Sequence, residues 1–346
     1  MKFLTFLILS TILITSCNKI KNQNTGTIIN LNKNIQNHIK YSYFTDSISY
    51  IPLETNDSCL IAKVKDIQMT DSFIFVLDQK QPVIFVFNQN GQFVNKIDRQ
   101  GQGPGEYGWI TQFYYNKHRN SISVCSAAGS CKIIEYNING DFINEFYTNY
   151  FVGDLYQFPN GDYLLSRIGR TDKPKTALIL CDSKGSIKKE ILSYKKEYAI
   201  DSSDNWELEV YNNSINFISP QLDNVIYTYD NDTLKRTIKF EIQPVPTKDF
   251  YKTRYDVLGL GPYFFRTVYK ESSKWIYLTY YSTEKGLRIL LYNKETSEFV
   301  IGEDTYNDID HKKFIAQTSA SENNTFTYCI EGEEDCNPII QILHLK

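Results

Sequence analysis

The stretch VIFVFNQNGQFVNKI, Val83–Ile97, decides the fold because its pattern returns along the chain. It predicts an apolar strand, an Asn, a tight turn and a second strand, since an Asn-Gly pair supplies the positive φ that short hairpins need. Five later segments repeat the pattern: KIIEYNINGDFINEF (132–146), ALILCDSKGSIKKEI (177–191), VIYTYDNDTLKRTI (225–238), RILLYNKETSEFVI (288–301) and the terminal IIQILHLK (339–346). The first strands of successive copies end 49, 45, 48, 63 and 51 residues apart, so one unit is used six times.

Two further strands precede the hairpin in each unit, as in Ala62–Met69 and Phe73–Leu77 of the first. Four strands repeated radially are typical of a β-propeller blade. The sixth unit stops after its third strand, which would leave an open edge. The unmatched strand Asp46–Glu54 has the length to fill that place. We therefore predict an all-β, six-bladed β-propeller with four-stranded blades, whose last blade is completed by the N-terminal strand.

The N-terminus carries the features of a targeting segment. Lys2 precedes the apolar run Phe3–Ile14, which is too short to span a bilayer, and Ile14-Thr15-Ser16-Cys17 resembles a bacterial lipobox. That resemblance implies cleavage before Cys17 and acylation of this residue; the alternative is a plain secretory signal with a chance cysteine. We expect a signal peptide at 1–16, a lipidated flexible tether rich in Asn and Lys at 17–40, and the propeller at 41–346.

Composition excludes some functions and leaves others open. The net charge of −3 gives no broad basic field for nucleic acid. The four histidines have no zinc-like spacing and no residues form a metal motif, so we expect no metal and no cofactor. A calcium ion in the channel remains an alternative, because oxygen ligands leave no spacing signature in a sequence. Six cysteines remain after Cys17, and two pairs could form disulfides at equivalent hairpins: Cys125 with Cys131 and Cys329 with Cys336.

The sequence resembles the six-bladed propellers of the NHL-repeat-like superfamily, in particular propeller lipoproteins of Bacteroidota-type bacteria. The resemblance rests on Cys17, the closing strand Ile51–Glu54, the strand pair Asp66–Asp78 and the stretch NGQFVNKIDRQGQGPGEY, 90–107. It spans Tyr41–Lys346 and implies fold and location more than activity. Enzymes of the superfamily usually hold a metal in the central channel, where this sequence offers Asp66, Asp154 and little histidine.

The glycine cluster Gly101-x-Gly103-Pro-Gly105 lies between two predicted blades. A dinucleotide-binding loop needs a following helix, whose N-terminus faces the phosphates, but a strand follows here. We therefore interpret the cluster as a structural corner.

The long loops, which all fall on one face of the predicted disc, are the expected site because function concentrates on loops held by a rigid scaffold. Arginine and aromatic residues favour binding there. The candidate ligand-binding residues are Arg99, Glu106, Tyr107, Trp109, Arg254, Tyr255 and Arg266.

No catalytic motif is visible, so we assign no catalytic residues. The sequence favours an envelope-anchored lipoprotein that binds or scaffolds a glycan, a peptide or an outer-membrane protein partner. It would be held through its lipid in the outer membrane, facing the periplasm. The alternative is a propeller hydrolase or lyase with a channel metal ion.

Overall fold

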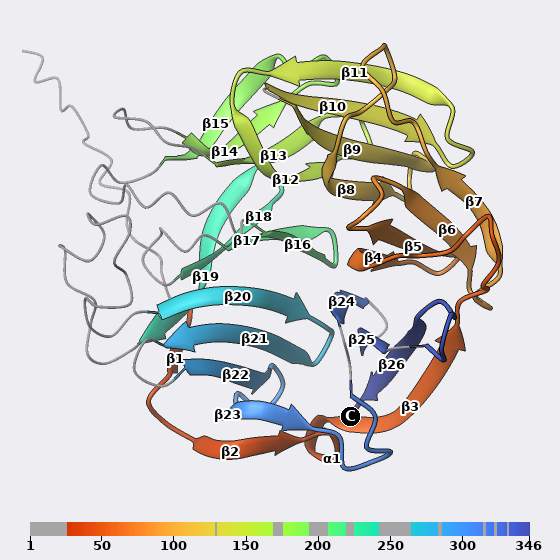
Figure 1. Ribbon diagram of the computed structural model, residues 1–346. Helices are drawn as coiled ribbons and strands as arrows, with labels where there is room; N and C mark the ends of the chain where they lie inside the picture. Colours follow the sequence, from red (N-terminus) through yellow and green to blue (C-terminus); the bar gives the residue numbers. More distant parts are fainter. Residues whose placement is uncertain are drawn as a thin grey trace, which may run out of the picture.

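The computed structural model describes residues 26–128, 130–168, 176–193, 207–218, 225–241, 264–282, 286–313, 316–321, 324–330 and 332–346. Six β-sheets are arranged in a ring around a central channel (Figure 1). The chain is a six-bladed β-propeller with four-stranded blades, as the repeat predicts.

Each of the first five blades is built from four consecutive strands, the innermost first. Blade 1 contains β4 (Val64–Met69), β5 (Phe73–Asp78), β6 (Ile84–Asn88) and β7 (Phe93–Ile97). Blade 2 contains β8 (Ile110–Asn116), β9 (Ser121–Ala128), β10 (Ser130–Asn137) and β11 (Phe142–Thr148). Blade 3 contains β12 (Phe151–Gln157), β13 (Tyr163–Ile168), β14 (Thr176–Cys181) and β15 (Ile187–Ser193).

The remaining blades include strands from the N-terminal segment. Blade 4 contains β16 (Glu207–Tyr211), β17 (Ser214–Ile218), β18 (Val225–Asp230), β19 (Thr233–Glu241) and the added strand β1 (Thr27–Asn30). Blade 5 contains β20 (Phe264–Glu271), β21 (Trp275–Ser282), β22 (Gly286–Asn293), β23 (Phe299–Tyr306) and the added strand β2 (Ile35–Lys40). Blade 6 contains β24 (Ala316–Ser321), β25 (Thr325–Ile330), β26 (Ile339–Leu345) and β3 (Thr45–Pro52).

The repeated Asn or Asp that follows the third strand explains the tight turn. The side-chain Oδ1 of Asn88 accepts the backbone N–H of Asn90 at 2.9 Å and of Gln92 at 3.0 Å. Asn137 and Asp182 make the same pair of bonds in blades 2 and 3. The glycine three positions later has a φ of +78°, +81° and +82° at Gly91, Gly140 and Gly185. Since L-residues rarely adopt this conformation, Asn/Asp-x-x-Gly fixes the hairpin in blades 1, 2 and 3.

The hydrophobic core lies between the blades. Buried apolar residues form six clusters, and each cluster joins two neighbouring blades. Phe75 and Val86 of blade 1, for example, pack with Phe113 and Tyr136 of blade 2. The high aromatic content therefore fills the wedge-shaped spaces of the ring.

The ring closes as the sequence predicts. Strand β3 pairs antiparallel with β26, with Ile51 opposite Ile340 and Tyr50 opposite Gln341. The buried Asn337 completes the junction with blade 1: its Nδ2 donates to the carbonyl oxygens of Glu54 (2.6 Å) and Cys59 (2.8 Å), and its Oδ1 accepts the N–H of Ile61 (2.8 Å). One side chain thus satisfies three backbone groups where the two ends of the propeller meet.

The prediction of a flexible tether over residues 17–40 is wrong for its second half. Strand β1 pairs in parallel with β19, and β2 pairs in parallel with β23. Ile29 and Ile39 are fully buried against those outer strands. With the short helix α1 (Tyr41–Phe44) they run along the outside of the ring to β3 (Figure 1). The apolar residues between the polar Asn and Lys residues explain the difference, because they are buried at the outer edge of a sheet. Residues 17–25 lie outside the described residues.

Neither predicted disulfide bond is present in the structure, in which Cys125, Cys131, Cys329 and Cys336 are free thiols. Cys125 in β9 and Cys131 in β10 are buried neighbours, and their mutual hydrogen bond lowers the pKa of the Cys131 thiol. Cys329 is buried in β25, whereas Cys336 is exposed in the following loop, so this second pair does not share one environment.

Among the described residues, no helix has the length and hydropathy needed to cross a membrane.

Candidate binding cavity in the central channel

A cavity of about 810 Å³ occupies the central channel. Strands β4, β8, β12, β16 and β20, the innermost strands of five blades, line it together with β25 and β26. The described lining residues outside strands all belong to the short turns: Thr70, Asp71, Gln89, Lys117, His118 and Asn213. The cavity therefore extends from the channel to the face of the short turns, opposite to the face where the sequence placed function.

β-bulges direct polar side chains into this cavity. The register shifts by one residue after Val64 in β4, after Ile110 in β8, after Val152 in β12 and after Arg266 in β20. The residues that follow these bulges all line the cavity: Asp66, Gln112, Asp154 and Val268. Bulges commonly re-aim side chains beside functional sites. Equivalent positions of the repeat thus place side chains of different chemical character in the same cavity.

Most charged groups of the channel tie one blade to the next. Lys65 of blade 1 donates to the carbonyl oxygens of Ile110 (3.0 Å) and Thr111 (2.7 Å) in blade 2. The Asp154 carboxylate of blade 3 accepts the N–H of Leu208 in blade 4 at 2.8 Å. These bonds connect the inner strands of neighbouring blades.

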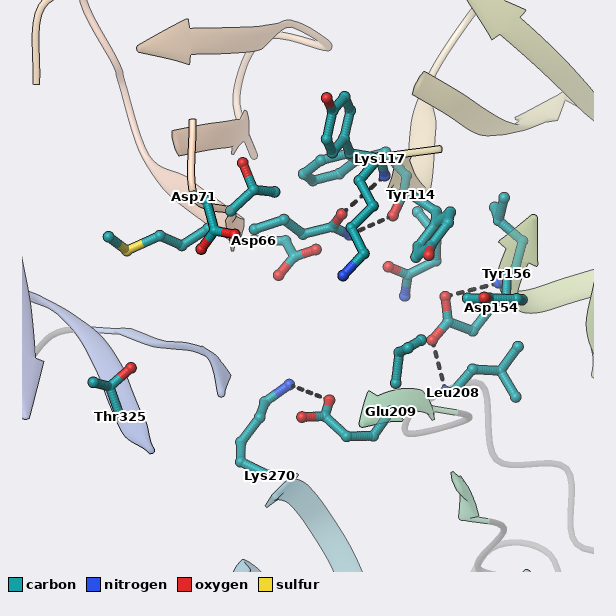
Figure 2. Close-up of a pocket in the computed structure, with 18 of the residues that line it drawn as sticks. Asp66, Asp71, Tyr114, Lys117, Asp154, Tyr156, Leu208, Glu209, Lys270 and Thr325 are labelled. Atoms are coloured by element: carbon teal, nitrogen blue, oxygen red, sulfur yellow. Dashed lines mark hydrogen bonds and ion pairs between the residues drawn. The ribbon is translucent and has the colours of Figure 1, made fainter. Parts of the chain in front are cut away.

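Blades 4 and 5 are joined by an ion pair. The Lys270 ammonium lies 3.1 Å from the Glu209 carboxylate, and both side chains are largely buried. Figure 2 shows this pair at the edge of the central space toward which Asp66 and Asp154 also point. Because each of these charges has an opposite partner, the pair is a structural tie between the blades.

Asp66 differs from the other inner-strand charges. Its carboxylate accepts hydrogen bonds only from its own strand, from the N–H of Ile67 at 2.8 Å and from the Gln68 side chain. It makes no ion pair with any described residue, and removal from bulk water raises its pKa above the usual range, partly offset by the charge of Lys270. The structure therefore holds a carboxylate in the cavity with no bonded cation.

This electrostatic cost predicts a stabilising substitution, Asp66→Asn. A raised carboxyl pKa means that the folded protein takes up this proton at a higher pH than the unfolded chain. The loss of folding stability caused by the ionised carboxylate is therefore complete above the folded-state pKa and disappears as the pH falls through it. We expect urea denaturation to show a higher free energy of unfolding for Asp66→Asn than for the wild type at pH 7. The difference should shrink as the pH is lowered towards 4. A variant that is less stable at pH 7 would contradict this account.

Three of the residues that the sequence nominated hold the glycine corner together. The Glu106 side chain accepts the N–H of Gly103 at 2.9 Å. Tyr107 is buried, and its hydroxyl donates to Ile97 O at 2.9 Å and accepts the N–H of Arg99 at 3.1 Å. Arg99 Nε in turn donates to Gly140 O at 3.1 Å. The cluster is therefore the structural corner that the sequence predicts, while these three residues serve the corner and do not line the cavity.

Of the other candidate binding residues, only Trp109 is described in full, and it does not line the cavity. Trp109 is 41% exposed and precedes β8. Arg266 lies in β20, but its side chain is outside what the structure describes, as are Arg254 and Tyr255 altogether. Among the described residues, no group of three or more His, Cys, Asp or Glu side chains could hold a metal ion. The calcium site considered for the channel stays a prediction.

Sequence reasoning noticed Asp66 and Asp154 only as channel residues without a metal partner. It missed Gln112 and Lys270, which follow the bulges of β8 and β20, because a bulge cannot be located from alternation alone. It also missed Glu209 in β16, whose pairing shows no register shift. The repeat itself contains a usable signal, since Asp66 and Asp154 occupy the same position of their blades and each accepts the N–H of the next residue at 2.8 Å.

Comparison with solved structures supports the propeller fold. A solved structure from Bacteroides fragilis, described as a "putative exported protein", is similar to it, with 19% identity and a TM-score of 0.75 over 92% of this chain and 100% of that chain. A Bacteroides vulgatus structure, described as a member of the DUF4221 family, is 12% identical, with a TM-score of 0.52 over 87% of this chain and 97% of that chain. No curated protein matches the chain significantly. A family model covers residues 26–339, so the chain belongs to the family described as "Domain of unknown function (DUF4934)".

Proposed function

We propose that the protein is an exported lipoprotein, anchored through Cys17, whose propeller binds a ligand in its central cavity. The observation that carries the proposal is a cavity of about 810 Å³ lined by side chains from at least five rigid inner strands. Ligand sites commonly have volumes of about 300–1,000 Å³ and combine apolar walls with a few polar groups. Phe113, Tyr114 and Tyr156 supply such walls here, beside Asp66 and Gln112.

Export is supported by the charged and apolar N-terminal segment and the lipobox-like residues before Cys17. The similar Bacteroides fragilis structure carries a description as an exported protein. We further propose attachment to the outer membrane on its periplasmic side and a relationship to NHL-repeat-like propellers. Acyl chains on Cys17 would anchor the protein, because each buried CH₂ contributes roughly 0.8 kcal/mol.

The cavity limits what the ligand can be. Its volume suits a small molecule, a short glycan or a few residues of a peptide. A partner protein would have to insert a segment into the channel from the short-turn face. We propose this cavity in place of the binding site predicted on the long-loop face, because Glu106 and Tyr107 on that face make hydrogen bonds around their own loop.

A cavity-filling variant tests the proposal. Gln112→Trp would place an indole inside the cavity, while Val94→Trp adds the same group on β7, where Val94 is 49% exposed. Proteins purified from the native envelope are denatured, and the released small molecules are identified by mass spectrometry. We expect a molecule that the wild type and Val94→Trp retain and Gln112→Trp loses. Identical profiles for all three proteins would refute binding in the channel.

The anchor is tested separately. We expect Cys17→Ser to abolish metabolic labelling with radioactive palmitate and to release the protein from the membrane fraction, because the thiol that carries the lipid is removed. Labelling that persists in Cys17→Ser would refute anchoring at this residue without bearing on the cavity.

A further inference from the structure

The charged groups that line the cavity are not evenly compensated. Four carboxylates (Asp66, Asp71, Asp154 and Glu209) and three lysines (Lys65, Lys117 and Lys270) are among the described lining residues. Lys65 donates to backbone carbonyls, Lys270 pairs with Glu209, and Lys117 also interacts with the described part of the protein. The lining therefore carries one carboxylate more than it has lysines, and among the described residues Asp66 has no ion-pair partner, although the charges of Lys270 and Lys65 act on it.

The two bulge aspartates show why Asp66 is the group available to a ligand. Asp154 accepts the N–H of Leu155 with one oxygen and the N–H of Leu208, on the next blade, with the other. Asp66 has the same bond to its following residue, but within the part of the chain that the structure describes it has no bond to a neighbouring blade. A carboxylate has about four acceptor sites, so Asp66 keeps acceptor capacity facing the cavity.

Resting on the proposed function, we infer that the ligand carries a protonated primary amine that is bound by the Asp66 carboxylate. An ammonium supplies three N–H donors and the opposite charge, and charge-assisted hydrogen bonds are stronger than neutral ones. Hydrogen bonds from the ligand's ammonium group would compensate the Asp66 carboxylate for the hydration that it loses on folding.

The surroundings of Asp66 favour an organic amine over an anion or a bare metal ion. Tyr114 and Tyr156, with ring centroids 4.8 Å apart, line the same cavity. Aromatic faces attract ammonium groups, and they also contact the carbon chain that carries the amine. A divalent ion would need several oxygen ligands at once, and no group of three such side chains exists among the described residues.

The test uses 1,5-diaminopentane as the probe and 1,5-pentanediol as its uncharged counterpart of the same length. Isothermal titration calorimetry at pH 7.5 compares the wild type with Asp66→Asn and with Asp71→Asn, which removes the same charge at the rim of the cavity. We expect the wild type to bind the diamine and not the diol. Asp66→Asn should weaken this binding at least about tenfold, and Asp71→Asn should change it less than about threefold.

The pH dependence gives a second readout. Diamine binding by the wild type should weaken as the pH falls through the raised pKa of Asp66, because protonation removes the charge that holds the ammonium. Asp66→Asn should show no such dependence. No measurable binding of the diamine at about 10 mM, equal binding of the diol, or an unchanged affinity in Asp66→Asn would each overturn the inference.

Failure of this inference can be distinguished from failure of the proposed function. If Gln112→Trp abolishes retention of a neutral or anionic molecule while Asp66→Asn leaves it unchanged, the channel is the binding site and the amine assignment is wrong. If neither the diamine nor any envelope molecule depends on Gln112→Trp, both are wrong.

Discussion

Replacing Asn337 with alanine is expected to lower the free energy of unfolding by about 3 kcal/mol or more, because each buried backbone group left without a hydrogen bond costs about 1–3 kcal/mol. The substitution would remove the partner of the Cys59 carbonyl oxygen and of the Ile61 N–H, and would leave the Glu54 carbonyl oxygen with only the weaker bond from the Cys59 thiol at 3.2 Å. They lie at the junction between the last blade and the first. Urea denaturation followed by tyrosine fluorescence would measure the loss.

Asn90→Ala is the matched control, since Asn90 is exposed in the turn of blade 1. Its stability should stay within about 0.5 kcal/mol of the wild type, as is usual for surface substitutions. If Asn337→Ala cost no more than this control, the junction would not depend on the Asn337 side chain.

The substitution Gly91→Ala should cost at least about 2 kcal/mol more than Gly140→Ala. Both glycines occupy the same turn position with nearly the same φ, +78° and +81°. A Cβ at Gly91 would overlap the carbonyl oxygen of Pro52, whereas a Cβ at Gly140 would meet its nearest atom at 3.7 Å. The shared backbone penalty of about 1–2 kcal/mol cancels in the comparison, and only the contact with the closing strand remains.

The expected clash at Gly91 also disturbs a hydrogen bond, because the Gly91 carbonyl accepts the N–H of Glu54 at 2.7 Å. Thermal unfolding of the two variants, measured side by side by circular dichroism, is sufficient to rank them. Equal losses in the two variants would show that the closing strand can move away from the turn of blade 1 without cost.

Much of the fold could be predicted because the residues that define the repeat determine the backbone conformation of their own neighbourhood. Asn-Gly turns, alternating apolar strands and a regular spacing of about fifty residues each specify structure within one blade. The strand that closes the ring could also be inferred by counting strands, because the sixth unit has three and one strand before the first unit is unmatched. The pairing of β1 and β2 with blades 4 and 5 could not, because a short polar segment shows no sign of the sheet edge on which it folds.

The site was harder to predict than the scaffold for a physical reason. Loop length indicates where a chain has room to vary, and this reasoning nominated Glu106 and Tyr107, which pack within their own corner. The cavity is instead lined largely by inner-strand residues, and in β4, β8, β12 and β20 their direction is set by bulges. Glu209 and Lys270 lie 61 residues apart on different blades, and only the closed ring brings them within 3.1 Å.

The N-terminal strands outside the ring have a mechanical consequence. If the protein is anchored through Cys17 as proposed, a pull from the membrane would reach β1 first and load its pairing with β19 along the strand direction, so several hydrogen bonds would share the force at once. The pairing of β2 with β23 would bear the load next. Tension would therefore be dissipated on the outer edges of blades 4 and 5 before it reached β3, and the closure of the propeller would be shielded from its own tether.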